Sequence, residues 1–320
     1  MTIKRILIFA PTLLIIFLLQ SYFWVPTYEQ QTKGNPQRLN EYITASIGDA
    51  SLLNPILSAD SASSQIEAMV FEGLIDRDEE LHFRGRLATS WEVYEEAFFY
   101  VNDSTEIPGL GKADADTIVE CIRKAKRKDY PSSPELKDIL NNIREISVIP
   151  ANVFVESRQI KDPKENEKSI EINIRVETPV RIKLTLTKVD QDLFKKLSQL
   201  FGKDYFSTFK GERYLSADSA VDKETLSAYE QEFLPATEHN PVLVFHLRPN
   251  VKFHDGHIFD SNDVKFTYEA IMNPKNISPR LADYEPVKAV EVVDPLTVRI
   301  IYKRLYSPAI GTWAMGILPE

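Results

Sequence analysis

The sequence predicts a mixed α/β fold of the α+β kind, and three observations lead to this class. Several short stretches alternate apolar and polar residues as half-buried strands do, for example Leu243, Phe245 and Leu247. Short segments with apolar residues at helical spacing follow polar residues able to cap a helix. The composition, 43% hydrophobic and 27% charged, is that of a soluble globular body.

Charge and cysteine content narrow the class of function. The net charge of -9 argues against a nucleic-acid partner, which would require a basic face. The single cysteine, Cys121, excludes an intrachain disulfide. Its helical spacing from Ile118 and Ile122 predicts a core or half-buried position. One cysteine also fits an oxidising compartment, where spare thiols are a liability.

The first 25 residues have the pattern of an export segment. Lys4 and Arg5 precede an apolar run from Ile6 to Leu19, and the aromatic cluster 22–24 closes it. No small-x-small cleavage site follows, and the segment has the roughly 20 residues that a bilayer requires. We therefore expect residues 1–25 to be an uncleaved signal-anchor, with a cleaved signal peptide as the alternative. The body is exported in either case, and residues 26–40 are interpreted as a linker.

The first elements of the body follow this linker. Tyr42–Ile47 alternates as a strand, and Asn54-Pro55 indicates a turn. A helix is predicted over Ser63–Leu74, with Ser63 or Ser64 as its cap and Gly73 as its terminator.

The stretch with the clearest pattern of predicted elements runs from Val242 to Ile271. It begins as an alternating strand, turns at Asp255-Gly256, and enters a helix capped at Asp260-Ser261. A hairpin over Val287–Tyr302 is predicted after it. Before it, residues 97–241 carry further predicted elements. These are strands at Phe154–Arg158, Ile170–Val176 and Val180–Thr187, a helix at Asp192–Phe201 ended by Gly202, and an exposed helix within Leu215–Phe233.

Specific residues of Val242–Ile271 resemble the signature of the family 5 extracellular solute-binding proteins, which serve peptide and nickel ABC importers. The shared pattern is F-x-L-R-x-x-V-K-F-H-D-G, followed by the D-V-x-F that begins the helix. The three motifs with which sequences of this family begin are also present in the same order, as Leu53–Pro55, Val70–Leu74 and Leu87–Glu92. The resemblance implies a periplasmic-binding-protein-like fold of class II, cluster C type, and the body would hold the N-terminal lobe strand and the accessory domain.

The resemblance also implies a division of the body. Residues 41–96 would start the solute-binding lobe and accessory domain, and residues 242–320 would continue the accessory domain, truncated before the second lobe. Residues 97–241 would be an insertion. Laid on the segment that follows at an offset near 146, the insertion matches Phe98–Val101 with Val244–Leu247 and Gly109 with Gly256. We interpret it as a degenerate duplicate of the accessory domain, with chance similarity as the alternative.

No catalytic or metal site is predicted. His254, Asp255, His257 and Asp260 are close in sequence, but neighbours on a strand point to opposite faces and do not share a ligand shell. The family resemblance assigns His-Asp-Gly to the turn, with Asp accepting backbone N–H groups. No phosphate-binding loop or nucleophile elbow is present, so we expect no enzyme and no cofactor.

The resemblance implies that the chain is the N-terminal portion of a substrate-binding component of an ABC importer. Such a protein captures an oligopeptide or another small solute outside the cytoplasm and delivers it to the permease subunits. By family position, Ala59, Asp60, Ser61 and Arg280 would contact the ligand. The alternative is a membrane-anchored extracytoplasmic interaction protein that has lost ligand capture.

Overall fold

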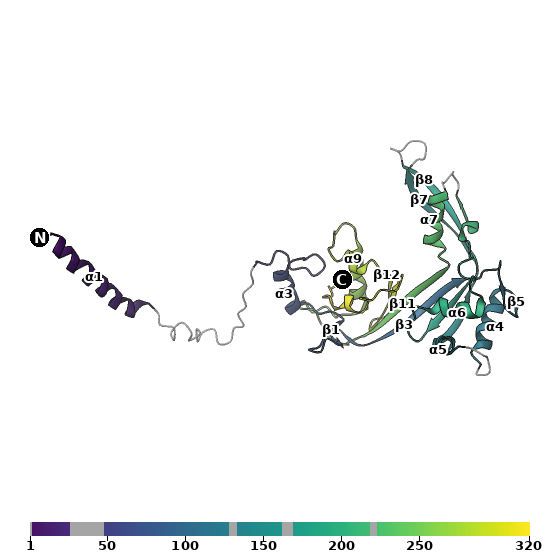
Figure 1. The fold of residues 1–320 in the computed structure, drawn as a ribbon, viewed down its shortest axis with the longest axis horizontal. Coiled ribbons are helices and arrows are strands. Elements are labelled where there is room, and N and C mark those ends of the chain that lie inside the picture. Colours follow the sequence, from purple (N-terminus) through teal and green to yellow (C-terminus); the bar gives the residue numbers. More distant parts are fainter. Residues whose placement is uncertain (1, 26–47, 128–132, 162–168, 218–222) are drawn as a thin grey trace. The chain divides into compact units, whose positions relative to one another are not determined.

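The computed structural model describes residues 2–25, 48–127, 133–161, 169–217 and 223–320 (Figure 1). The chain forms two units, residues 1–49 and 50–320. In the first unit, α1 runs from Thr2 to Trp24. Across the described ranges, no helix is both long enough and apolar enough to cross a membrane. The signal-anchor stays a prediction. The predicted linker and the predicted strand Tyr42–Ile47 lie outside the described residues.

A six-stranded antiparallel sheet is the centre of the second unit, with the strand order β12-β13-β11-β3-β9-β6. The long strands β3 and β11 lie next to each other in the middle, and Pro241 is opposite Glu95. The bounds of the six strands are Ala88–Tyr100 for β3, Ile143–Ile149 for β6, Arg181–Leu186 for β9, Thr237–Leu247 for β11, Val287–Asp294 for β12 and Thr297–Tyr302 for β13.

Among the described residues of this unit, three smaller sheets and a set of helices accompany the six-stranded sheet. The small sheets pair β1 (Ile75–Arg77) with β2 (Phe83–Gly85), β4 (Glu106–Ile107) with β5 (Gly111–Lys112), and β8 (Ser169–Thr178) with both β7 (Asn152–Lys161) and β10 (Leu215–Ala217). The helices are α3 (Ser61–Val70), α4 (Ala115–Ala125), α5 (Pro134–Asn142), α6 (Leu193–Phe201), α7 (Lys223–Phe233), α8 (Ser261–Met272) and α9 (Leu281–Tyr284), with short 3-10 turns η2 (Gly211–Tyr214) and η3 (Gly311–Ala314).

The two halves of the six-stranded sheet repeat one order of elements. In one half, β11 leads to α8 and α9 and then to β12 and β13, and the strands stand as β12-β13-β11. In the other half, β3 leads to α4 and α5, then to β6 and later to β9, and the strands stand as β6-β9-β3. Asp114 and Asp260 are the N-caps of the two corresponding helices, α4 and α8. This order is what a duplication requires; the duplication itself stays a prediction.

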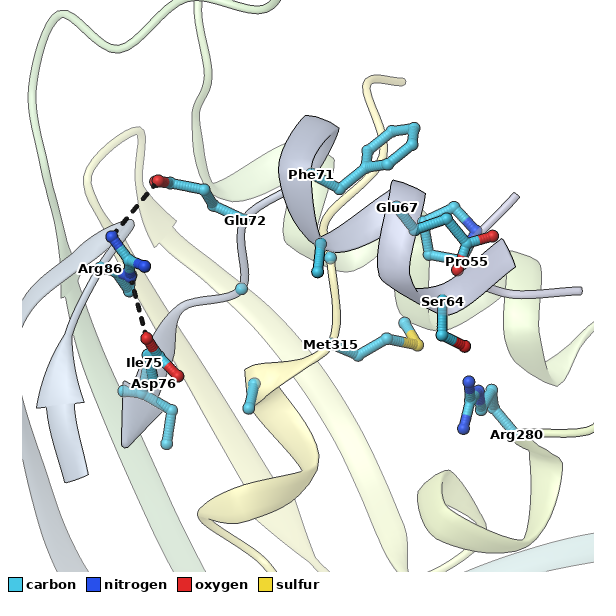
Figure 2. A pocket seen from close by; sticks show the side chains of 14 residues that line it. Pro55, Ser64, Glu67, Phe71, Glu72, Ile75, Asp76, Arg86, Arg280 and Met315 are labelled. Atoms are coloured by element: carbon cyan, nitrogen blue, oxygen red, sulfur yellow. Dashed lines mark hydrogen bonds and ion pairs between the residues drawn. The ribbon is translucent and has the colours of Figure 1, made fainter. Parts of the chain in front are cut away.

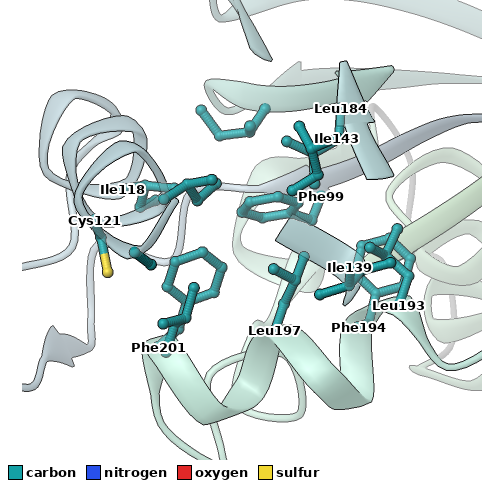
Figure 3. Close-up of a cluster of buried hydrophobic side chains, with 14 of the residues drawn as sticks. Phe99, Ile118, Cys121, Ile139, Ile143, Leu184, Leu193, Phe194, Leu197 and Phe201 are labelled. Atoms are coloured by element: carbon teal, nitrogen blue, oxygen red, sulfur yellow. The ribbon is translucent and has the colours of Figure 1, made fainter. Parts of the chain in front are cut away.

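Both halves pack their helices on the same face of the sheet. Trp91 and Phe99 lie on one face of β3 because residues alternate along a strand, and Trp91 is opposite Phe245 of β11. In the half that contains β3, side chains from α4, α5 and α6 enclose Phe99, whose ring makes edge contacts with Phe194 and Tyr205 (Figure 3). Cys121 is buried in this cluster, as predicted, and burial raises the pKa of its thiol. In the other half, Phe245 and Trp313 belong to a second cluster with α8 and α9.

Most predicted elements are present where turn-forming and helix-capping residues define them. The Asp255-Gly256 turn is confirmed by the φ of 96° at Gly256, and Asp260 caps α8 in a capping box. The helix predicted over Asp192–Phe201 and the hairpin over Val287–Tyr302 are also present. The helix predicted over Ser63–Leu74 is shifted, because α3 begins after Asp60 and ends at Val70.

Candidate functional site: two adjoining hollows beside helix α3

Helix α3 begins at a carboxylate that accepts several hydrogen bonds. Asp60 accepts from the backbone N–H of Ser63 at 2.8 Å, from the Ser63 hydroxyl at 2.7 Å and from the Ser51 hydroxyl at 2.6 Å. These bonds, the one from Ser51 first, lower the pKa of Asp60 to about 2. The prediction of Ser63 or Ser64 as the cap is wrong, because Asp60 precedes them and its side chain accepts the free N–H of Ser63.

This cap makes stability depend on pH, and we expect Asp60→Ala to lower the melting temperature at pH 7. The folded-state pKa lies below the ordinary value of 3.8, so the contribution is present above about pH 4 and disappears as the pH falls toward 2. The difference in melting temperature between wild type and variant should therefore shrink between pH 4 and pH 2. Glu79→Ala, at an exposed position, is the control that should show no such trend. A difference that is constant down to pH 2 would contradict the assignment.

The four residues predicted to contact a ligand come together. Ala59, Asp60, Ser61 and Arg280 line one open hollow of about 630 Å³ beside the first turn of α3. Two segments distant in sequence form it, because Arg280 stands at the N-terminus of α9. A hydrogen bond from the Ser278 hydroxyl to the carbonyl of Ile56, at 2.5 Å, ties these segments together. We call this hollow the outer hollow; a role in binding stays a prediction.

A second, smaller pocket of about 320 Å³ adjoins the outer hollow and shares Ser64, Ala68 and Arg280 with it. It lies between α3, Arg280 and the segment Ala314–Gly316, and we call it the α3 pocket (Figure 2). Sequence reasoning did not single out its central residue, Glu67. The one signal was an acidic residue among the apolar positions Ile66, Met69 and Val70.

Close packing of two backbone segments forms the floor of the α3 pocket. The N–H of Leu74 donates to the carbonyl of Trp313 at 2.9 Å, and the N–H of Ile317 donates to the carbonyl of Glu72 at 3.0 Å. A Cβ atom at Gly73 would lie 2.4 Å from the carbonyl oxygen of Ala314, so only glycine fits there. Gly73 was predicted to terminate the helix; this is wrong, since α3 ends at Val70 and Gly73 permits the approach of residue 314.

Charged residues at one side of the α3 pocket neutralise each other. Arg86 forms ion pairs with Glu72 at 3.6 Å and with Asp76 at 3.2 Å, as Figure 2 shows. A hydrogen bond from Arg84, followed by one from the backbone of Arg77, lowers the pKa of Asp76. These exposed ion pairs contribute little to stability. Because their charges are paired within the protein, this side of the pocket does not require a charged ligand.

His and Asp side chains of the signature form hydrogen bonds in the turn and at the start of α8. Asp255 accepts the N–H of His257 at 2.9 Å, and Asp260 caps α8. His257 Nε2 contacts the buried Asp263 carboxylate at 3.2 Å, and Asp263 accepts the N–H of Asp260 at 2.8 Å to complete the capping box. In the part of the chain that the structure describes, no group of three or more His, Cys, Asp or Glu residues is placed to hold a metal ion.

Part of this unit is similar to known proteins. Residues 236–318 match the model of the bacterial extracellular solute-binding proteins, family 5, middle region. The glutathione-binding protein GsiB of Salmonella paratyphi A is 41% identical over 68 residues, which are 21% of this chain and 13% of GsiB. The di/tripeptide-binding protein 4 of Pseudomonas aeruginosa is 35% identical over 88 residues, 22% of this chain and 16% of that protein. The matched stretches thus span less than a fifth of these relatives.

Two solved structures are similar to a larger part of the chain. The oligopeptide-binding protein AppA of Bacillus subtilis, in complex with a nonapeptide, is 16% identical with a TM-score of 0.38, covering 86% of this chain and 26% of AppA. NikZ of Campylobacter jejuni, in complex with Ni(L-His), is 16% identical with a TM-score of 0.36, covering 85% and 26%. The match to the family model is to residues 236–318.

Proposed function

We propose that this chain, a member of the family 5 bacterial extracellular solute-binding proteins through its residues 236–318, captures a small solute outside the cytoplasm. The captured solute would be delivered to the permease subunits of an ABC importer, and no chemical step on it is required. The family and the relatives support an exported, solute-binding protein. No observation favours the alternative of an interaction protein without ligand capture.

The observation that carries this proposal is the convergence of two distant segments at the outer hollow. The loop 58–61 belongs to the family-like opening of the body, and Arg280 lies within the matched region. The hollow combines a carboxylate at Asp60, a guanidinium at Arg280 and the hydroxyl of Ser61. Groups of both charges beside hydroxyls suit a polar solute with several donors and acceptors.

A thermal-shift screen of the purified full chain tests the proposal. The solutes follow the proteins compared above: glutathione, di- and tripeptides, a nonapeptide and Ni(L-His). A ligand that binds only the folded state at a hundredfold excess over Kd adds about 2.7 kcal/mol of stability. At least one class is expected to raise the melting temperature. Arg280→Ala should reduce that shift, and Arg144→Ala, at an exposed position of β6, should not. No shift with any of these solutes would contradict the proposal.

A further inference from the structure

The α3 pocket contains an incompletely satisfied carboxylate. Glu67 is only 6% exposed. Its Oε2 atom accepts the hydroxyl of Ser58 at 2.7 Å, but the buried Oε1 atom has no hydrogen-bond partner among the described residues. A buried carboxylate oxygen without a donor is costly, and proteins generally supply a partner. Glu67 is therefore placed to accept a hydrogen bond from a positively charged group that enters the pocket.

Arg280, in contrast, has a hydrogen-bond donor without an acceptor. Its Nε atom is buried and has no acceptor among the residues that the structure describes. Glu67 and Arg280 line the same pocket, with Ser64 and Met315 nearby (Figure 2). One unmet acceptor and one unmet donor in a shared pocket match a ligand that carries an ammonium and a carboxylate.

The walls limit the size and polarity of such a ligand. The volume of about 320 Å³ is at the low end of the roughly 300–1,000 Å³ typical of ligand pockets. Phe71, Ile75 and Met315 give apolar surface to the walls of the pocket. The remaining charged side chains are paired, since Arg86 is held by Glu72 and Asp76. A short solute with a small apolar part fits these conditions.

We propose that the α3 pocket binds a compact zwitterion of the amino-acid type, with its ammonium on Oε1 of Glu67 and its carboxylate on Nε of Arg280. This inference rests on the proposed function, because it names the class of solute that enters the pocket adjoining the outer hollow. It also assigns to Glu67 the role of selecting for the ammonium group.

Isothermal titration of the full chain with the twenty common L-amino acids tests the inference. At least one should bind, and its N-acetyl derivative and its amide should each bind about 10- to 100-fold more weakly, because each lacks one charged group. Glu67→Gln keeps the shape and the acceptor for Ser58, and it should weaken binding of the free amino acid by a similar factor. Glu269→Gln, exposed on α8, is the matched control and should leave Kd unchanged.

The stability of Glu67→Gln separates loss of binding from loss of folding. Without ligand, the variant should melt at or above the wild-type temperature, because a neutral amide is less costly than an unpaired buried carboxylate. Equal binding by Glu67→Gln and wild type would overturn the inference. Binding of a relative's solute but of no amino acid would overturn the inference and leave the proposed function standing. No binding of any solute would overturn both.

Discussion

Replacing Trp313 by alanine is expected to destabilise the second unit more than any other single core substitution in the half that carries α8. The side chain is fully buried; its ring meets Tyr284 edge-to-face at 5.3 Å, and its Nε1 atom donates to the Tyr302 hydroxyl at 3.0 Å. Removal of a buried tryptophan costs about 3–5 kcal/mol. That is a large fraction of the roughly 5–15 kcal/mol that stabilises a typical domain.

The cavity left by the missing side chain should also loosen the backbone at residue 313, next to the floor of the α3 pocket. The carbonyl of Trp313 accepts the N–H of Leu74, and this bond holds residues 314–316 against the segment after α3. Urea unfolding followed by far-ultraviolet circular dichroism measures the loss. Trp313→Phe should retain part of the packing and cost less. Val148→Ala, at an exposed position of β6, should change stability by no more than about 0.5 kcal/mol. A cost below about 1 kcal/mol for Trp313→Ala would contradict its role in the core.

The second large effect is expected on the opposite face of the six-stranded sheet, at Arg299. Its guanidinium pairs with Glu96 at 2.9 Å and with Glu291 at 2.5 Å, and it donates to the Tyr94 hydroxyl at 3.0 Å. Glu96 also pairs with Lys183 of β9 at 2.8 Å. Since β13 and β9 belong to different halves of the sheet, this network connects the halves through side chains.

Arg299→Met is expected to cost about 3 kcal/mol, because it leaves the mostly buried carboxylate of Glu96 with fewer partners. The double variant with Glu96→Gln should recover part of the loss, since the uncompensated charge at residue 96 is then absent. Arg304→Met is the control: this arginine is 61% exposed and pairs with Glu285, so its loss should cost less than about 1 kcal/mol. Additive effects of Arg299→Met and Glu96→Gln, measured by urea unfolding, would show that the two residues are not coupled.

Local chemistry made one part of the fold predictable. The turn at Gly256 and the cap at Asp260 depend on residues a few positions apart, and both are found where the sequence places them. At α3 the same capping preferences allow more than one residue to be the N-cap. Asp60, Ser63 and Ser64 are all good cap residues, and Asp60 is the cap because its carboxylate also receives the Ser51 hydroxyl, nine residues away.

The parts that could not be predicted depend on contacts between distant segments. No residue near Gly73 in the sequence indicates that the backbone of Ala314 approaches Gly73 so closely that only glycine fits. The pairing of β3 with β11 joins residues more than 130 positions apart. Glu67 could be noticed as an acidic residue at a partly apolar position, but its missing partner is visible only once the α3 pocket is formed. The four ligand-contact residues were predicted from the family resemblance, and the structure brings them together at the outer hollow. Their role in binding stays a prediction.

Hydrogen exchange of the full chain, with and without the solute that gives the largest thermal shift, tests the central claim most directly. The claim is that a solute binds beside α3. We predict slower exchange of backbone amides in Ser61–Val70 and in residues 314–317, which line or adjoin the two hollows. Amides of α4 and α5, in the opposite half of the sheet, should be unchanged. Protection confined to α4 and α5, with none at α3, would contradict the claim.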